Sequence, residues 1–164
     1  MSIISNSSPL IFLGKIGRLD ILEKLFVKVY IPQAVYDETV LPDKDDDVSR
    51  TIVEKVSLGQ FEVFKVGNEV AIRALAGRLH LGEIEVIIGA DELNIRNVIL
   101  DDVYARNKAK QFELSVTGTL GILLLAFNQG FIEDIELELQ RLMDIGFRIS
   151  NDLLRKIISQ AKGL

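Results

Sequence analysis

Short apolar runs alternate with longer segments in which apolar residues recur three or four positions apart. The short runs are rich in β-branched and aromatic residues, which is typical of strands. The longer segments are bounded by proline, glycine or small polar residues, which is typical of helices. The predicted strands are 2–5, 28–31, 61–66, 97–100 and 114–116. The predicted helices are 9–25 with a break at Gly14 or Gly17, 33–40, 48–56, a segment from after Gly67 to near Gly77, 83–93, 103–112, 118–128, 134–144 and 151–161.

Strands that alternate with helices predict an α/β fold with a parallel sheet that is covered by helices on both faces. The length of 164 residues and the absence of a low-complexity linker predict one domain over residues 1–164. A hydrophobic fraction of 48% and a charged fraction of 26% are ordinary for a globular chain. We therefore expect an ordered domain with a full core.

Composition also excludes several kinds of chemistry. The chain has no cysteine, so it has neither disulfides nor a thiolate nucleophile. Its longest apolar run, 122–127, is far shorter than the roughly 20 residues of a membrane span, so we expect a cytoplasmic protein with no membrane partner. A net charge of −5 argues against general adhesion to nucleic acid, but an acidic site neutralised by a metal is compatible with it.

Polar residues follow several predicted strands at the point where each strand ends. They are Asn6, Asp101, Asp102 and the run 117–119. Ligands of open parallel sheets bind at this carboxyl edge, where successive loops converge. Glu38 and Glu83 lie in or near the start of helices that could flank the same edge. The sequence therefore predicts a cluster of oxygen ligands without histidine or cysteine.

Such a cluster suits Mg²⁺ or Mn²⁺, because hard cations prefer oxygen ligands and bind through a few carboxylates together with substrate phosphates. A bound ion can activate water and stabilise a leaving oxygen, so the protein then needs no nucleophilic side chain. This chemistry fits a chain with one histidine and no cysteine.

Five segments, in this order, resemble the PIN-domain superfamily, in particular its prokaryotic branch of small VapC-like toxins. They are ISNSSPLI, IPQAVYDE, LGEIEVIIGADE, NVILDDVYAR and SVTGTLGILLLA. The resemblance extends from the first strand to about residue 150. It implies a three-layer α/β/α sandwich with a short parallel sheet, a site for Mg²⁺ or Mn²⁺, and hydrolysis of RNA. It also implies that the chain could form a homodimer and be held inactive by an antitoxin peptide.

The resemblance assigns the metal ligands to four positions. The first acidic position of the family falls on Asn6, and the next two fall on Glu38 and Glu83. The last falls on Asp102 or Asp101, of which we favour Asp102. Asn6 is the departure from the family pattern, because an amide keeps an oxygen ligand but lacks the charge.

Each assigned residue also has a structural interpretation. Ser8 and Pro9 are typical of a helix start, with serine as N-cap. Glu83 could interact with a helix dipole, and Asp102 could cap a helix and pair with Arg106. The acidic run 43–54 has the spacing of a calcium loop but lacks the glycine that the turn requires, so we interpret it as a solvated loop.

Three functions remain open from the sequence. The leading hypothesis is a metal-dependent ribonuclease, with basic residues positioning the RNA backbone. The candidate basic residues are Lys15, Arg18, Arg106, Lys108 and Lys110. The alternative is a PIN-like binding or regulatory module that is catalytically weakened by Asn6. The third is a metal-dependent phosphohydrolase of small phosphoesters.

Overall fold

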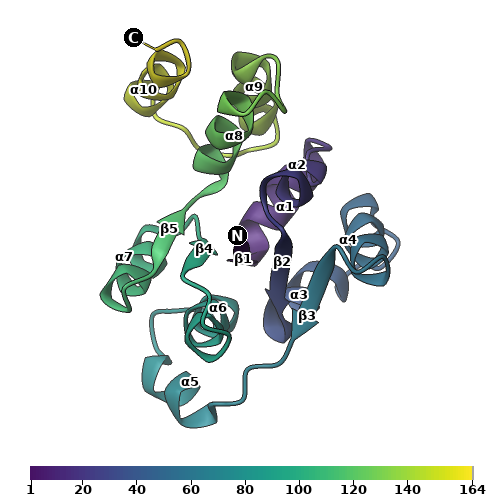
Figure 1. Ribbon diagram of the computed structural model, residues 1–164, viewed down its shortest axis with the longest axis vertical. Coiled ribbons are helices and arrows are strands. Elements are labelled where there is room, and N and C mark those ends of the chain that lie inside the picture. Colours follow the sequence, from purple (N-terminus) through teal and green to yellow (C-terminus); the bar gives the residue numbers. More distant parts are fainter. Residues whose placement is uncertain (164) are drawn as a thin grey trace.

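Five parallel strands form the central sheet of the computed structural model, which describes residues 1–163 (Figure 1). The strands are Ser2–Ser5 (β1), Lys28–Pro32 (β2), Phe61–Phe64 (β3), Asn97–Ile99 (β4) and Ser115–Thr117 (β5). Their order across the sheet is β3-β2-β1-β4-β5. The first strand of the chain is therefore the middle strand of the sheet, paired with β2 on one side and with β4 on the other.

Ten helices are described around this sheet. They are Ser7–Lys15 (α1), Asp20–Leu25 (α2), Gln33–Val40 (α3), Asp47–Ser57 (α4), Glu69–Leu75 (α5), Leu81–Glu92 (α6), Val103–Gln111 (α7), Thr119–Asn128 (α8), Ile135–Asp144 (α9) and Asn151–Ala161 (α10). Helix α6 packs on β1, β2 and β4, and α7 packs on β5. Helices α2 and α8 pack on β2 and β5 and on each other, and α1 packs against α8.

The direction of the crossovers explains this layering. From β1 to β3 the chain moves toward one edge of the sheet, and from β3 to β5 it moves toward the other edge. Because such crossovers are nearly always right-handed, the two sets of connecting helices lie on opposite faces of the sheet. The result is the expected three-layer α/β/α sandwich.

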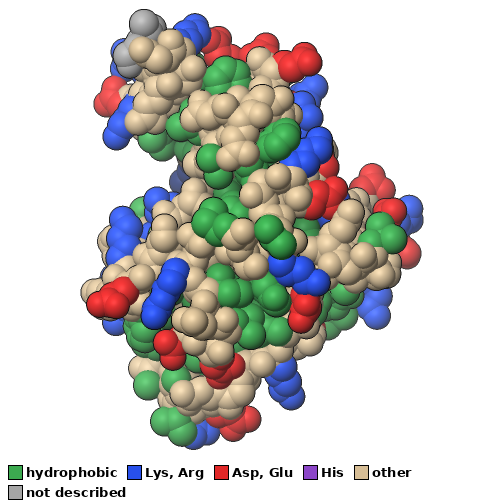
Figure 2. Space-filling view, viewed as in Figure 1, with side chains coloured by type: hydrophobic (Ala, Val, Ile, Leu, Met, Phe, Trp, Pro, Cys, Tyr) green, Lys and Arg blue, Asp and Glu red, His purple; other side chains and the backbone are tan. Residues whose placement is uncertain are grey.

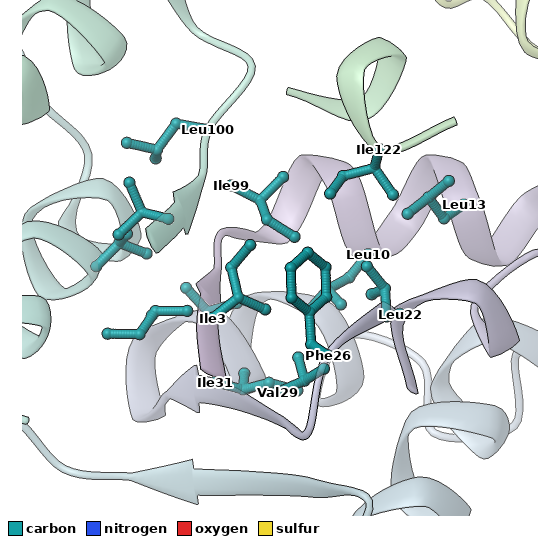
Figure 3. Close-up of a cluster of buried hydrophobic side chains, with 14 of the residues drawn as sticks. Ile3, Leu10, Leu13, Leu22, Phe26, Val29, Ile31, Ile99, Leu100 and Ile122 are labelled. Carbon is teal, nitrogen blue, oxygen red and sulfur yellow. The ribbon is translucent and has the colours of Figure 1, made fainter. Parts of the chain in front are cut away.

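The core covers both faces of the sheet, and one part of it lies where α1, α2 and α8 meet the sheet. Figure 3 shows the Phe26 ring among Leu10, Leu22 and Val29. Leu10, Leu22 and Val29 are fully buried, and Phe26 is 5% exposed. Burial of a side chain of this size contributes about 1.5–3 kcal/mol. This packing holds α1, and with it the polar turn that precedes α1, against the sheet.

The predicted elements are all present, and several begin or end one or two residues away from the predicted bounds. The predicted break in the first helix is also present. The helix predicted over 9–25 is divided into α1 and α2, and the chain turns at Gly17, whose φ of 72° is readily adopted by glycine. The strand predicted over 61–66 ends at Phe64.

The acidic run 43–54 is a turn followed by a helix. Asp46 caps α4, with its carboxylate accepting hydrogen bonds from the N–H groups of Val48 and Ser49. Its carboxylate therefore stabilises a helix start. The loop interpretation holds only for residues 43–46, because residues 47–54 belong to α4, close to the helix predicted over 48–56. None of the helices in residues 1–163 combines the length and apolar character that a membrane span requires.

Candidate functional site

The candidate site lies at the carboxyl ends of β1 and β4, where the strand order changes direction. Asn6 follows β1, and its N–H donates to the carbonyl oxygen of Ile99 in β4 over 3.1 Å. Asp101 and Asp102 follow the same β4 strand. Ligands of open parallel sheets bind at such a switch point. The structure thus places residues that are distant in the sequence at one edge.

Asn6 and Glu38 converge over the start of α6. A Cβ atom built on Gly82 would lie 2.8 and 3.0 Å from the two carboxylate oxygens of Glu38 and 3.2 Å from Asn6 Oδ1. Both side chains therefore occupy the space that a larger residue at position 82 would fill. The Ser7 hydroxyl donates a hydrogen bond to Glu38 Oε2 and fixes that carboxylate beside Asn6.

Glu83 is the next residue of α6 and is only 7% exposed. Its Oε2 accepts a hydrogen bond from the backbone N–H of His80 over 3.0 Å, as a first-turn acid of a helix commonly does. Burial raises the pKa of Glu83, and the negative charges of Asp102 and Glu38 raise it further, against the opposing effects of the His80 N–H bond and charge. Glu83 is therefore a buried acid that interacts with two other candidate ligands.

Asp101 accepts three hydrogen bonds, which connect the segments that meet at the switch point. Its Oδ2 accepts from the Ser8 hydroxyl over 2.9 Å and from Thr119 Oγ1 over 2.7 Å, and its Oδ1 accepts from Thr119 N over 2.7 Å. The carboxylate thus joins the starts of α1 and α8 to the end of β4. Ser8 and Thr119 take up acceptor capacity that an ion would otherwise use.

The prediction that Ser8 is an N-cap is wrong. Asn6 occupies the N-cap position of α1 and Ser7 is the first helical residue, so Ser8 lies inside the first turn. Its hydroxyl is engaged with Asp101 from a distant part of the chain, a partner that local capping preferences do not reveal.

Asp102 caps α7 and has a freer carboxylate than Asp101. Its Oδ2 accepts from the N–H of Ala105 over 2.9 Å, as the structural interpretation predicted. Its Oδ1 has no hydrogen-bond partner within residues 1–163, and the side chain is exposed. Arg106 is not its ion-pair partner, since Arg106 Nη1 donates to the carbonyl oxygen of Leu100 over 3.0 Å.

The donor set of this edge suits a hard cation in kind but does not form a closed cage. The candidate donors Asn6, Glu38, Glu83 and Asp102 all offer oxygen, which Mg²⁺ and Mn²⁺ prefer. Within the described part of the chain, however, no group of three or more His, Cys, Asp or Glu side chains could hold a metal ion. An ion here would be bound directly by few side chains and would keep several waters, which is the usual state of Mg²⁺.

Two residues with roles at this edge escaped the sequence analysis. Gly82 leaves the space in which Asn6 and Glu38 meet. Glu85 is buried, and its Oε2 accepts from Ala34 N over 2.7 Å at the start of α3, the helix that carries Glu38. Burial raises the pKa of Glu85, and the Asp37 and Glu38 charges raise it further, while the Ala34 hydrogen bond and Lys65 lower it. The signal in the sequence was the LGEIE run, where a second acid follows Glu83 two positions later.

The basic residues proposed for RNA contact fall into different environments. The Arg18 guanidinium forms an ion pair with the buried carboxylate of Glu138 in α9 and so has a partner within the protein. Lys15 and Glu38 line one hollow of about 240 Å³ beside the site. Arg106 and Asp101 line a larger cleft on the other side.

Comparison with known proteins agrees with this architecture. The family model DUF3368, described as a PIN domain, matches residues 2–163. The chain belongs to the PIN-domain family. PIN domains are generally nucleases that use divalent metal ions. No curated protein matches the sequence.

A solved PIN-domain structure also matches the fold. It is the PilT N-terminus domain protein SSO1118 of the hyperthermophilic archaeon Sulfolobus solfataricus P2, which is 20% identical and superposes with a TM-score of 0.53. The match covers 77% of this chain and 93% of the archaeal chain. At this identity the similarity establishes the shared fold.

Proposed function

We propose that this PIN domain is a metal-dependent endoribonuclease that hydrolyses phosphodiester bonds of RNA, as a VapC-like toxin controlled by an antitoxin peptide. The observation that carries the proposal is the convergence of Asn6 Oδ1 and the Glu38 carboxylate over Gly82, beside the buried Glu83. Family membership supports a nuclease. The resemblance to the VapC-like branch supports RNA as the substrate.

In the proposed site Glu38 and Asn6 bind Mg²⁺ or Mn²⁺ directly, and Glu83 and Asp102 contribute charge and bind through water. The ion supplies Lewis-acid stabilisation and a nucleophilic water. Ser7 orients Glu38, and the His80 N–H orients Glu83. Asp101 positions the loops through Ser8 and Thr119 rather than acting as a ligand.

Cleavage of a labelled single-stranded RNA in Mg²⁺ or Mn²⁺ tests the mechanism. We expect Glu83→Gln and Asp102→Asn each to reduce the cleavage rate by at least about 10²-fold, because transition-state stabilisation by charge is lost. Lys24→Ala is the control and keeps the wild-type rate, because Lys24 lies in the last turn of α2, which leads into the amino end of β2 at the opposite edge of the sheet. Undiminished cleavage in excess EDTA would reject metal dependence.

One observation favours a second function, a PIN-like binding or regulatory module with weakened catalysis. Asn6 is an amide at the point where it meets the Glu38 carboxylate, so the site has one charge fewer than an acid there would give.

The variant Asn6→Asp distinguishes the two functions. The added carboxylate is expected to raise Mn²⁺ affinity on the order of tenfold, because ligand charge tunes divalent-ion affinity. Titration calorimetry measures this affinity, and the RNA assay measures the rate. Cleavage by the wild type at the rate of the Asn6→Asp variant supports the enzyme, whereas cleavage by the variant alone supports the weakened module.

A further inference from the structure

A cleft of about 530 Å³ opens between the end of the sheet and the C-terminal helix α10. Its floor is the end of β5 and the first turns of α8, one wall is α7, and the other wall is the segment around Phe147 together with α10. Figure 2 shows a deep notch between the C-terminal helices and the rest of the molecule. The cleft begins at Asp101 and Val103, which flank the candidate ligand Asp102.

The lining of this cleft is mainly apolar, with two guanidinium groups. Val103 is 71% exposed and Leu153 is 40% exposed, although both are large apolar side chains that are usually covered. Phe147 adds an aromatic ring, which also packs edge-on against Phe12 with the centroids 4.9 Å apart. The cleft thus exposes apolar surface beside a charged site.

The two arginines of the cleft, Arg106 and Arg148, differ in their hydrogen bonding. Arg106 donates to the Leu100 carbonyl, and its Nη1 lies beside Asp101 Oδ1 near the position of Gly118. Arg148 is exposed and makes no hydrogen bond or ion pair within residues 1–163. The free guanidinium of Arg148 can attract an anion to this cleft. The chain as a whole has a net charge of −5, so this attraction is local and not that of a generally basic surface.

This combination matches an unpaired nucleotide. Proteins bind single-stranded RNA by packing unstacked bases on aromatic, apolar or guanidinium surfaces and by pairing phosphates with arginine. The volume is that of a small-molecule pocket, which can enclose one or a few nucleotides but not a duplex. The continuity with Asp101 places such a nucleotide next to the proposed metal site.

We infer that this cleft binds the unpaired RNA strand on one side of the cleaved bond, with a base against Val103, Phe147 and Leu153 and a phosphate at Arg148. The inference rests on the proposed function and adds to it a path for the RNA strand beyond the acidic site. In this arrangement the RNA runs from the acidic site along α7 and then between the end of the sheet and α10.

Binding in EDTA tests the cleft without cleavage. The probe is a fluorescent single-stranded RNA, measured by anisotropy over a range of salt concentrations, with a duplex of the same sequence for comparison. Arg148→Ala removes the free guanidinium, and Leu153→Ser removes exposed apolar surface against which a base would pack. Arg155→Ala is the matched control, because Arg155 is on the same helix as Leu153 but pairs with Asp152 at the surface.

We expect Arg148→Ala and Leu153→Ser each to weaken single-strand binding on the order of tenfold. Arg148→Ala should also lower the slope of log affinity against log salt by about one. Arg155→Ala should bind the single strand as the wild type does, and none of the variants should change binding of the duplex. Circular dichroism melting confirms that the variants fold.

Two outcomes would overturn the inference, and both differ from failure of the proposed function. If both cleft variants bind single strands as the wild type does while the wild type cleaves RNA in Mg²⁺ or Mn²⁺, the strand takes another path and the nuclease stands. If only Arg148→Ala weakens binding, the cleft holds a phosphate but no base. If the wild type binds RNA through the cleft but never cleaves it, the nuclease function fails and the cleft assignment stands.

Discussion

At the scale of single residues, Gly82 determines whether Asn6 and Glu38 can meet. Its role is to leave space at the start of a helix, where glycine has no conformational advantage over alanine. A Cβ atom at position 82 would clash with the ends of the Glu38 and Asn6 side chains and not with the backbone.

Gly82→Ala is therefore expected to separate function from folding. The added methyl group displaces Glu38 and Asn6, and a displacement of about 1 Å costs cleavage on the order of 10²-fold. Unfolding in urea should change by less than about 1 kcal/mol, because alanine is the better helix former. The matched control is Gly67→Ala, where the nearest atom to a new Cβ is 3.8 Å away. Wild-type cleavage by Gly82→Ala would show that the convergence of the two side chains is not needed.

Glu85 gives the molecule a pH-dependent stability. Its pKa is raised above the ordinary value near 4.5, mainly by burial, so the folded state holds this proton to higher pH than the unfolded state does. Below both pKa values Glu85 is protonated in the folded and the unfolded state, so its titration does not change the free energy of unfolding. As pH rises from the unfolded pKa through the folded pKa, the fold loses stability, because the unfolded state ionises more readily.

Glu85→Gln removes this titration while keeping an oxygen that can accept from Ala34 N. In metal-free buffer, the unfolding free energy of the variant relative to wild type should rise as pH increases from 4 and then level off above the folded pKa. Urea unfolding followed by circular dichroism at several pH values measures it. A relative stability that does not vary with pH would contradict the raised pKa.

At the scale of elements, the turn between α1 and α2 is clamped to α9 by one ion pair. Arg18 donates to the carboxylate of Glu138, which is 1% exposed, while Arg141 lies 3.4 Å away as a weaker second partner. Glu138 Oε2 is buried without a hydrogen-bond partner among the described residues. The clamp therefore depends on Arg18.

Arg18→Ala is expected to destabilise the fold by about 2–3 kcal/mol, because it leaves a buried carboxylate without its main counter-ion. The double variant Arg18→Ala/Glu138→Leu should recover much of that loss, since no buried charge remains. Thermal and urea unfolding measure both. Lys24→Ala, which breaks an exposed ion pair with Asp20, is the control and should change stability by less than about 1 kcal/mol. Equal losses in the single and double variants would contradict the buried-charge explanation.

The sequence predicted elements well because their signals are local. Apolar spacing and the proline before α3 gave α3 its observed bounds, and glycine marked the turn after α1. The prediction that Ser8 caps a helix was wrong because it rested on neighbouring residues, whereas the partner of Ser8 is Asp101, distant in the chain. The ion pair of Arg18 with Glu138 also joins residues distant in the chain, and no local pattern indicates it.

At the scale of the whole molecule, the alternation of strands and helices made the site predictable in outline. Parallel strands bring their carboxyl ends to one edge, which was enough to select Asn6, Asp101 and Asp102 as neighbours. The space at Gly82 and the hydrogen bond from Thr119 to Asp101 depend on how distant segments pack, which the spacing of apolar residues does not indicate. The identity of the ligands among the selected residues stays a prediction.

The central position of β1 has a consequence for the order in which the chain is made. Asn6 and Glu38 leave the ribosome early, but β1 pairs with β4, and Asp101 is held by Thr119, both much later in the chain. The candidate site therefore cannot assemble until most of the protein has been synthesised. If the proposed ribonuclease activity is borne out, the nascent chain acquires it only when its synthesis is nearly complete.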